Sequence, residues 1–387
     1  MSWPIVQLQV LALQEKGAIV SGPFGSNIGS RFFVEQGVPV IRGNNLTKGY
    51  KKFIDDGFVY LTDSKAAEFP NCIAKADDIV FTAAGSIGQV GLIPRDSKFD
   101  KYIISNKQLR VRLNQKKADP LFVYYWLSSK RMIQYLEGMN NGGAVPLINL
   151  GIIRKVPVPL PEFTIQRRIA DILSAYDDLI ENNRRRIQLL EQAARLLYKE
   201  WFVHLRFPGH EHVKIKGGVP EGWEKKPLGD IAPLKYGKAL KKDDRVPGPY
   251  PVYGSSGIVG AHNKALVSGS AIIVGRKGNV GSVYWSEDDF HPIDTVYFID
   301  SGNCNLYLYY ALLHIQFINT DVAVPGLNRD FAHSRLLLVP DTKMLRLFDE
   351  IATPIHEQIV RLDRYNRALS RARDMLLPRL MNGSIAV

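Results

Sequence analysis

Polar and basic residues that can hydrogen-bond to nucleic-acid bases or phosphates gather in short Gly- and Asn-rich loops of this sequence. In the first half they are Arg42, Asn44, Asn45, Ser86, Asn106, Lys107, Asn140 and Asn141, and in the second half Lys238, Tyr253, Ser255, Ser256, Arg276, Lys277, Asn279, Asn328 and Arg329. Arg and Lys can pair with guanine and Asn with adenine, while glycine lets the backbone approach a phosphate. Asn-Gly and Ser-Gly pairs are also common in plain turns, so both interpretations are open for a single loop. As a set, the loops favour DNA recognition.

The landmarks around these loops occur twice, in the same order. A Trp-x4-Leu segment opens each copy, at Trp3–Leu8 and Trp223–Leu228, and Val38-Pro39-Val40 or Tyr250-Pro251-Val252 follows. Next come a Gly-x-Ile/Val-Gly loop, at Gly85–Gly88 and Gly278–Gly281, and an Ala-Val-Pro-x-x-Asn segment, at Ala144–Asn149 and Ala323–Asn328. The four offsets of 220, 212, 193 and 179 residues shrink steadily, as loop deletions in the second copy would produce. The sequence therefore predicts an internal repeat.

Short β-type runs dominate each copy and are separated by Gly, Asn and Ser. The expected strands are Val38–Arg42, Asp78–Thr82 and Gln108–Leu113, then Ala271–Val274, Gly281–Trp285 and Thr295–Ile299. Helices are expected at Leu121–Glu137 and at its counterpart Leu306–Ile318, where apolar residues recur at helical spacing. Each copy is thus expected to form a mixed, mainly β module whose loops carry the variable residues.

A long amphipathic helix is expected to follow each module. The first, from Glu162 to Val203, carries apolar residues at alternating spacings of four and three that include Ile169, Leu173, Ile180 and Ile187. The second, from Thr342 to Leu380, carries Ile355, Leu362 and Leu369 in its stripe, and Pro354 and Pro378 are expected to kink or interrupt it. Such stripes are typical of coiled coils. A run of about 40 residues at 1.5 Å each forms a rod of about 60 Å, long enough to act as a spacer.

Antiparallel pairing of the two helices is the simplest way to bury both stripes, and it would hold the modules at opposite ends. Asn183 and Asn366 interrupt the stripes, and they either fix the register of the pair or form a solvated break. The alternatives are that each helix packs on its own module or pairs with a second chain. The expected fold class is α+β: two mixed, mainly β domains separated by two long antiparallel coiled-coil helices, with a pseudo-twofold internal repeat.

The net charge of +12 favours a polyanionic partner. The excess is local, because residues 1–161 carry 20 Lys and Arg against 12 Asp and Glu, whereas residues 204–341 carry 15 against 14. The second module still has a basic cluster of Lys225, Lys226, Lys235, Lys238, Lys241, Lys242 and Arg245. Asp243 and Asp244 lie within it, so a solubilising surface and a phosphate-binding surface are both open interpretations.

Several functional classes have no support in the sequence. The 387 residues can form more than one core, but no apolar run approaches 20 residues and no signal peptide is visible, so a soluble, cytoplasmic protein is expected. The motifs of adenine methyltransferases and of ATP-binding loops are absent. The histidines, Cys72 and Cys304 show no metal-ligand spacing. We therefore expect no catalytic residues, no metal site and no cofactor in this chain.

The order of these segments resembles the specificity subunits of type I restriction–modification systems. The Trp-initiated modules look like the target-recognition domains of that family. The segments from Gln166-Arg167-Arg168-Ile169-Ala170 to Trp201-Phe202 and from Leu376 to Gly383 look like its central and distal regions. The resemblance covers nearly the whole chain. The shortened, nearly neutral second module departs from the pattern and puts the contacts to its half-site in doubt.

The resemblance implies a non-catalytic DNA-binding subunit that acts in defence against foreign DNA. Each target-recognition domain would read one half of a bipartite, asymmetric sequence, and the helices would set the gap. The implied partners are double-stranded DNA, two methyltransferase subunits that use S-adenosylmethionine, and two motor-nuclease subunits that use ATP and magnesium. The helix residues Ile169, Leu173, Ile180, Ile187, Ile355, Leu362 and Leu369 would serve helix pairing and partner docking.

The expected domains are residues 1–161 and 204–341 for target recognition, residues 162–203 and 342–380 for the helices, and a tail at 381–387. Two other functional hypotheses are open. A standalone DNA-modifying enzyme would show methyl-transfer activity as a purified chain. A coiled-coil scaffold would bind nucleic acid weakly, with strong salt sensitivity and no sequence preference.

Overall fold

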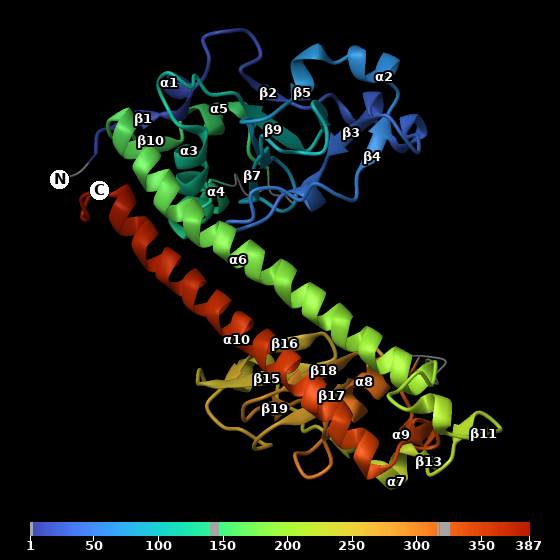
Figure 1. Cartoon of the computed structure of the whole chain (residues 1–387). Coiled ribbons are helices and arrows are strands. Elements are labelled where there is room, and N and C mark those ends of the chain that lie inside the picture. The colour runs from blue at the N-terminus through green and yellow to red at the C-terminus, as the bar shows by residue number, and fades with distance from the viewer. Residues whose placement is uncertain (1–2, 140–146, 316, 318–325) are drawn as a thin grey trace. The chain divides into compact units, whose positions relative to one another are not determined.

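The computed structural model of the chain describes residues 3–139, 147–315, 317 and 326–387. It forms two compact units: Met1–Asn183 with Arg364–Val387, and Arg184–Asp363 (Figure 1). Two long helices contribute to both, α6 (Phe163–Tyr198) and α10 (Thr342–Met381). None of the helices in the described ranges is long and apolar enough to cross a membrane.

The first unit combines short strands with short helices. These are β1 (Ile5–Gln7), α1 (Leu8–Leu11), β2 (Ile19–Ser21), β3 (Val38–Ile41), β4 (Val59–Leu61), α2 (Asp63–Ala67), β5 (Ile73–Ala74), β6 (Ile79–Thr82), β7 (Val90–Leu92), β8 (Tyr102–Ile104), β9 (Gln108–Val111), α3 (Pro120–Leu127), α4 (Lys130–Gly138), α5 (Leu150–Arg154) and β10 (Pro157–Pro159).

The second unit has a similar series. Its elements are β11 (Ile215–Lys216), β12 (Val219–Pro220), β13 (Glu224–Pro227), α7 (Leu228–Ile231), β14 (Lys235–Tyr236), β15 (Tyr250–Gly254), β16 (Gly257–His262), β17 (Ala271–Gly275), β18 (Val283–Ser286), β19 (His291–Pro292), β20 (Val296–Ile299), α8 (Leu306–His314), α9 (Arg329–His333) and β21 (Leu336–Val339).

The two units share most of their sheet topology, although the sheet β4-β3-β8-β5 of the first unit has four strands and its counterpart β16-β15-β19 has three. A four-stranded antiparallel sheet has the order β2-β9-β6-β7 in the first unit and β14-β20-β17-β18 in the second. A parallel pair follows in each, β3 with β8 and β15 with β19, and an antiparallel pair closes each unit, β1 with β10 and β13 with β21. The internal repeat predicted from the landmarks is therefore present in the strand pairing. All six strands predicted from the sequence occur, with ends within two residues of the prediction.

The single helix predicted at Leu121–Glu137 is wrong, because α3 ends at Leu127 and α4 begins at Lys130. The Ser129 hydroxyl accepts a hydrogen bond from the Met132 amide and starts a new helix, a known preference of serine at N-caps. The counterpart α8 ends at His314, earlier than the predicted Ile318, which lies outside the described residues.

The interruption expected in the second long helix does not occur, because α10 continues through Pro354 and Pro378. Each proline removes one N–H donor, which leaves the carbonyl groups of Glu350 and Asp374 without their helical partners. Both prolines are exposed, so water can reach this side of the helix. Of the two expected outcomes, an interruption is therefore wrong, and a kink stays a prediction.

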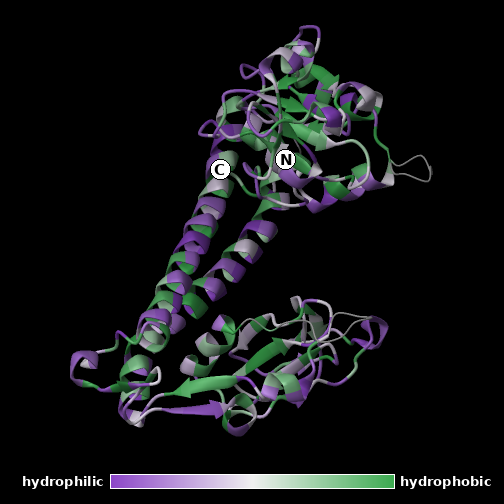
Figure 2. Ribbon diagram, turned by 90° about the vertical axis from the view of Figure 1, so that its right-hand side faces the viewer, coloured by the Kyte–Doolittle hydropathy of each residue, from purple (hydrophilic) through white to green (hydrophobic). Residues whose placement is uncertain are grey.

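The ends of the long helices are anchored in the two hydrophobic cores. In the first unit, Ile169 and Leu173 of α6 and Leu377 and Leu380 of α10 are buried in one cluster. In the second unit, the other ends contribute Ala194, Tyr198, Met344, Phe348 and Ala352. Burial of each Leu or Ile side chain contributes about 1.5–3 kcal/mol to the stability of the fold, so these ends stabilise the helices. Elsewhere along the helices, polar and apolar residues alternate (Figure 2).

Two glycines allow a close approach of backbone segments at equivalent places. The Gly22 amide donates to the Gln108 carbonyl over 3.0 Å, and the Gly237 amide to the Val296 carbonyl over 3.1 Å. A Cβ atom added at Gly22 would lie 1.9 Å from the Ser105 carbonyl oxygen, and one at Gly237 would lie 2.0 Å from that of Ile293. Both neighbours are backbone atoms, so neither can move aside without disturbing the sheet.

We predict that Gly22→Ala and Gly237→Ala each destabilise the chain by at least the roughly 1–3 kcal/mol typical of overpacking. Urea unfolding followed by tryptophan fluorescence measures this as a lower transition midpoint. Gly138→Ala is the matched control, because nothing lies within 4 Å of the place that its new Cβ atom would take and helical alanine is favourable. A Gly22→Ala midpoint equal to that of the wild type would contradict the close approach.

Candidate nucleic-acid interface

Three loops of the first unit meet at one edge, where β3, β6 and β8 end. The Ser105 amide donates to the Ile41 carbonyl over 3.0 Å, and the Ala83 amide donates to the Lys107 carbonyl over 2.7 Å. These bonds bring together the loops at residues 42–45, 83–89 and 105–107, which the sequence singled out separately. We call this edge the first loop face.

The first loop face presents both donors and acceptors to its surroundings. Asn44, Ser86, Asn106 and Lys107 are exposed there, and Arg42 is half-buried. The Asn44 side-chain amide donates to the Gly57 carbonyl over 3.2 Å, which orients this exposed side chain. Asn140 and Asn141 lie outside the described residues. The exposed side chains are of the types that read bases and bind phosphates.

Asn45 does not fit its predicted role as a base-reading residue. It is fully buried, its Oδ1 accepts from the Arg42 amide over 2.9 Å, and its Nδ2 donates to the carbonyls of Ile54 and Asp56 over 3.0 and 2.9 Å. Its side-chain amide therefore holds two loop segments together. A buried polar group with all partners satisfied is typical of a structural role.

The second unit has an equivalent edge, which we call the second loop face. The amides of Arg276 and Lys277 both donate to the Thr295 carbonyl, over 2.9 and 3.1 Å. The Leu327 amide donates to the Arg276 carbonyl over 2.8 Å, and the Asn279 amide to the Ser255 hydroxyl over 3.4 Å. The loops at residues 253–256, 276–279 and 326–329 thus lie together.

Exposed candidates of the second loop face are Lys238, Ser256, Lys277 and Asn279, and Ser255 is half-buried in a turn. The Asn328 side chain is exposed but its oxygen caps α9, where it accepts from the Phe331 amide over 3.0 Å. Tyr253 does not fit a base-reading role, because its ring is 7% exposed and packs edge-on against Phe290 with ring centres 5.4 Å apart. Its ring belongs to a hydrophobic core rather than to the surface.

Arg276 and Arg329 converge on a residue that the sequence analysis missed. Tyr236, at the end of β14, lies below both guanidinium groups, whose carbons are each 5.0 Å from its ring centre. Tyr297 packs on Tyr236 with ring centres 5.1 Å apart, and burial raises the pKa of Tyr297 to about 12, so its hydroxyl stays neutral and donates to the Leu327 carbonyl. In the sequence, only the flanking basic residues Lys235 and Lys238 indicated that Tyr236 could belong to a DNA-binding surface.

The two long helices contact each other within the first unit. The Asn183 side-chain amide donates to the Asn366 oxygen over 3.0 Å, and both residues are buried. Asp177 of α6 pairs with Arg373 of α10 and also accepts from the Tyr125 hydroxyl over 2.6 Å. Burial alone would lower the pKa of Arg373, but its hydrogen bonds to Asp374 and Asp177 raise it above the ordinary value. Arg373 also lies 4.1 Å from the centre of the Tyr50 ring. The sequence had singled out Asn183 and Asn366, but not the contacts that Asp177 makes with Arg373 and Tyr125.

The predicted docking residues differ in burial. Ile169, Leu173 and Ile180 of α6 and Leu362 of α10 are buried. Ile187, Ile355 and Leu369 are half-buried, so part of each side chain is accessible.

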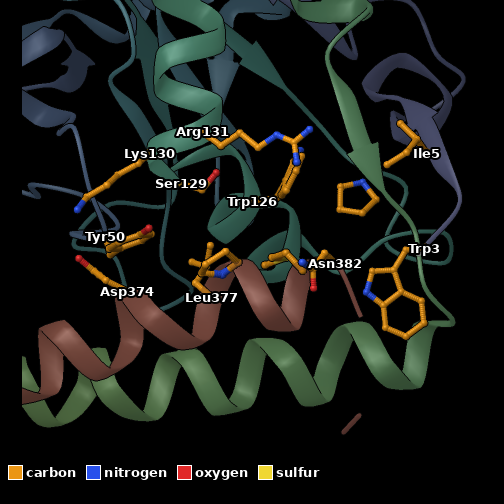
Figure 3. A pocket seen from close by; sticks show the side chains of 13 residues that line it. Trp3, Ile5, Tyr50, Trp126, Ser129, Lys130, Arg131, Asp374, Leu377 and Asn382 are labelled. Carbon is orange, nitrogen blue, oxygen red and sulfur yellow. The ribbon is translucent and has the colours of Figure 1, made fainter. Parts of the chain in front are cut away.

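The first unit also contains a pocket of about 350 Å³ between the end of α10, the start of α4 and strands β1 and β10 (Figure 3). Trp3, Trp126, Pro159 and Leu377 form apolar walls, and Lys130, Arg131 and Asp374 are polar lining residues. Trp3 Nε1 donates to the Leu380 carbonyl over 3.1 Å and Trp126 Nε1 to that of Pro157 over 2.7 Å, so both rings are held in place. These walls are mainly apolar and suit an apolar group.

Nothing in the described part of the chain resembles a metal centre, since no three His, Cys, Asp or Glu side chains come together there. The two loop faces offer hydrogen-bond donors, hydrogen-bond acceptors and cations on a backbone frame that is held by the sheets. Such a surface can bind and discriminate a polyanionic ligand.

Comparisons with known proteins agree with this geometry. The family model described as the type I restriction modification DNA specificity domain matches residues 32–192 and 220–329. The MjaIX specificity subunit of Methanocaldococcus jannaschii is 23% identical over 382 residues, with 90% of this chain and 87% of the relative covered. The HindI specificity subunit of Haemophilus influenzae is 23% identical over 381 residues, with 75% and 83% covered.

Among solved structures, the type I restriction–modification S subunit from M. genitalium has a TM-score of 0.60 at 18% identity, with 98% of this chain and 96% of that chain covered. This likeness concerns the fold. The family match covers well over half of the residues in two segments, one for each copy of the repeat. The chain therefore belongs to the family of type I restriction modification DNA specificity domains.

Proposed function

We propose that this chain is the DNA-reading specificity subunit of a type I restriction–modification complex. Each loop face reads one half of a bipartite, asymmetric site. The observation that carries the proposal is the convergence, in both units, of loops rich in Asn, Ser, Lys and Arg on equivalent strand ends. Family membership supports the same function, because the relatives are named as specificity subunits of type I restriction enzymes.

The helices α6 and α10 form an antiparallel coiled coil that sets the unread gap between the half-sites. The contacts of Asp177 with Arg373 and of Asn183 with Asn366 support this arrangement, because the residue number rises along one helix as it falls along the other. The alternating apolar stripe of both sequences favours a continuation of the pairing. Asn183 and Asn366 fix the register, since an unpaired amide in such a seam is costly.

The reactions belong to partner subunits in this proposal. Two methyltransferase subunits, which use S-adenosylmethionine, and two motor-nuclease subunits, which use ATP and magnesium, assemble on the chain. The half-buried apolar side chains of Ile187, Ile355 and Leu369 support a docking role for the helices, because each still has accessible apolar surface. The division of the sequence into recognition domains at residues 1–161 and 204–341 and helices at 162–203 and 342–380 is part of the proposal.

Co-expression of the chain with its methyltransferase partner, followed by long-read mapping of adenine methylation across a genome, tests the function. A single gapped and asymmetric motif is expected, because two different loop faces at a fixed separation would read two different half-sites. Methylation without a gapped motif, or no association with the partner, would contradict the proposal.

We predict that Asn106→Ala relaxes one base position in one half of the motif and leaves the other half unchanged. Loss of a good amide–base pair costs about 1–3 kcal/mol of discrimination at the base it reads. The measurement is the methylation motif of the variant complex. Asn71→Ala is the control, since Asn71 is an exposed amide beside Gly17, at the opposite end of β2. An Asn106→Ala motif identical to that of the wild type would remove Asn106 from the reading residues.

We predict that Asn183→Leu lowers the free energy of unfolding by about 1–3 kcal/mol, because it leaves the Asn366 amide buried without a partner. The double variant Asn183→Leu/Asn366→Leu should recover most of this loss, since two apolar groups can pack together. Urea unfolding measures stability, and the methylation motif reports the gap. A role in register requires that the double variant methylates sites of more than one gap length. A stable double variant with one unchanged gap would contradict it.

A further inference from the structure

The cluster of Tyr236, Arg276 and Arg329 on the second loop face concentrates positive charge on one exposed ring. Tyr236 is 47% exposed, and both arginine side chains are half-exposed above it. Arg276 Nη1 donates to the Asp294 carbonyl over 3.1 Å, which holds that guanidinium group in place. Stacking on an aromatic ring leaves the N–H edges of a guanidinium group free to bind a further partner.

The cluster has little negative charge to balance it. In the part of the second unit that the structure describes, no carboxylate lies within ion-pair distance of Arg276, and the one near Arg329 is Asp330, at the limiting distance of 4.0 Å and highly exposed. Arg329 Nε is buried and has no hydrogen-bond partner among the described atoms. Two guanidinium groups held at one ring repel each other, so an anion bound between or beside them would stabilise the arrangement.

The fold itself does not require these three residues. The strand pairs Tyr236 with Tyr297 and Ser21 with Leu109 are equivalent, so Ser21 takes the place of Tyr236 in the first unit. Ala83 takes the place of Arg276. Its amide donates to the Lys107 carbonyl and its carbonyl accepts from the Ile148 amide, as those of Arg276 do with Thr295 and Leu327. Leu150 takes the place of Arg329, since each follows the asparagine that caps its helix. The first unit thus forms the same backbone without cation or ring.

We propose that Tyr236, Arg276 and Arg329 form a binding site for a backbone phosphate of the DNA duplex, present in the second unit and absent from the first. This inference rests on the proposed DNA-reading function and assigns its residues a definite part in it. A paired guanidinium site suits the oxygens of a phosphate, and Lys277, exposed beside Arg276, adds to the local positive charge. The site also explains how a unit whose globular part carries 15 basic against 14 acidic residues binds a polyanion.

The test measures duplex affinity against salt concentration for the full chain co-purified with its methyltransferase partner. The probes are a fluorescent duplex that carries the methylation motif and a duplex of scrambled sequence. Arg276→Gln and Arg329→Gln remove one cation each, and Tyr236→Leu removes the ring that positions both. Tyr236→Phe keeps the ring. Arg335→Gln is the matched control, because Arg335 is an exposed arginine of the same unit that also stacks on an aromatic ring, that of Phe331 at 5.6 Å.

Arg276→Gln and Arg329→Gln are each expected to bind both duplexes more weakly and to reduce the slope of log affinity against log salt by about 1. Tyr236→Leu should resemble them, whereas Tyr236→Phe and Arg335→Gln should behave as the wild type. If the wild-type complex binds DNA and both glutamine variants bind it with the same affinity and the same salt slope, the phosphate site is overturned but the proposed function is not. A loss of affinity for the motif duplex alone, with unchanged affinity for the scrambled duplex, would overturn the phosphate site and indicate that these residues read bases. A wild-type complex that does not bind duplex DNA would overturn the proposed function together with the site.

Discussion

In each unit, the residue that follows the central strand, β6 or β17, makes two backbone hydrogen bonds, and these bonds hold the loop face together. At Ala83 the amide donates to the Lys107 carbonyl and the carbonyl accepts from the Ile148 amide, and Arg276 makes the same pair of bonds with Thr295 and Leu327. Because only backbone atoms take part, the side chains at these positions are free to differ. The arrangement keeps several loops at the same places in both units while their chemistry changes, which is what two readers of different half-sites require.

The strands and the repeat could be predicted from the sequence because they depend on local patterns. Runs such as Ile79–Thr82 and Ala271–Gly275 are apolar, rich in β-branched residues and bounded by turn residues. The break at Ser128–Ser129 was missed because the apolar spacing continues across it, and only the N-cap of Ser129 reveals it. Helix α10 continues through its prolines, and its two ends are anchored in hydrophobic cores, which a local sequence pattern does not reveal.

The candidate site was harder to predict than the fold, because burial decides which polar residue can act. Asn44 and Asn45 are neighbours of the same type, yet one is exposed and the other holds loop segments from inside. Tyr253 looked like an exposed loop residue but packs in a core, whereas Tyr236, from a short strand, has an exposed ring that two arginines contact. Sequence pattern gives the location of a loop to within a few residues, but the direction of a side chain depends on partners far away in the chain.

The same separation of backbone and side-chain roles allows the sequence of such a unit to vary while its fold is kept. At 18% identity the M. genitalium subunit still aligns over 98% of this chain, and the MjaIX subunit is 23% identical over most of its length. The conformation of each unit needs a few fixed features, such as glycines where backbone segments touch and an asparagine that caps the helix after the last loop. Exposed loop side chains contribute little to stability, so they can change to suit a new DNA sequence at almost no cost to the fold. A cationic cluster confined to one unit is the kind of difference that this freedom permits.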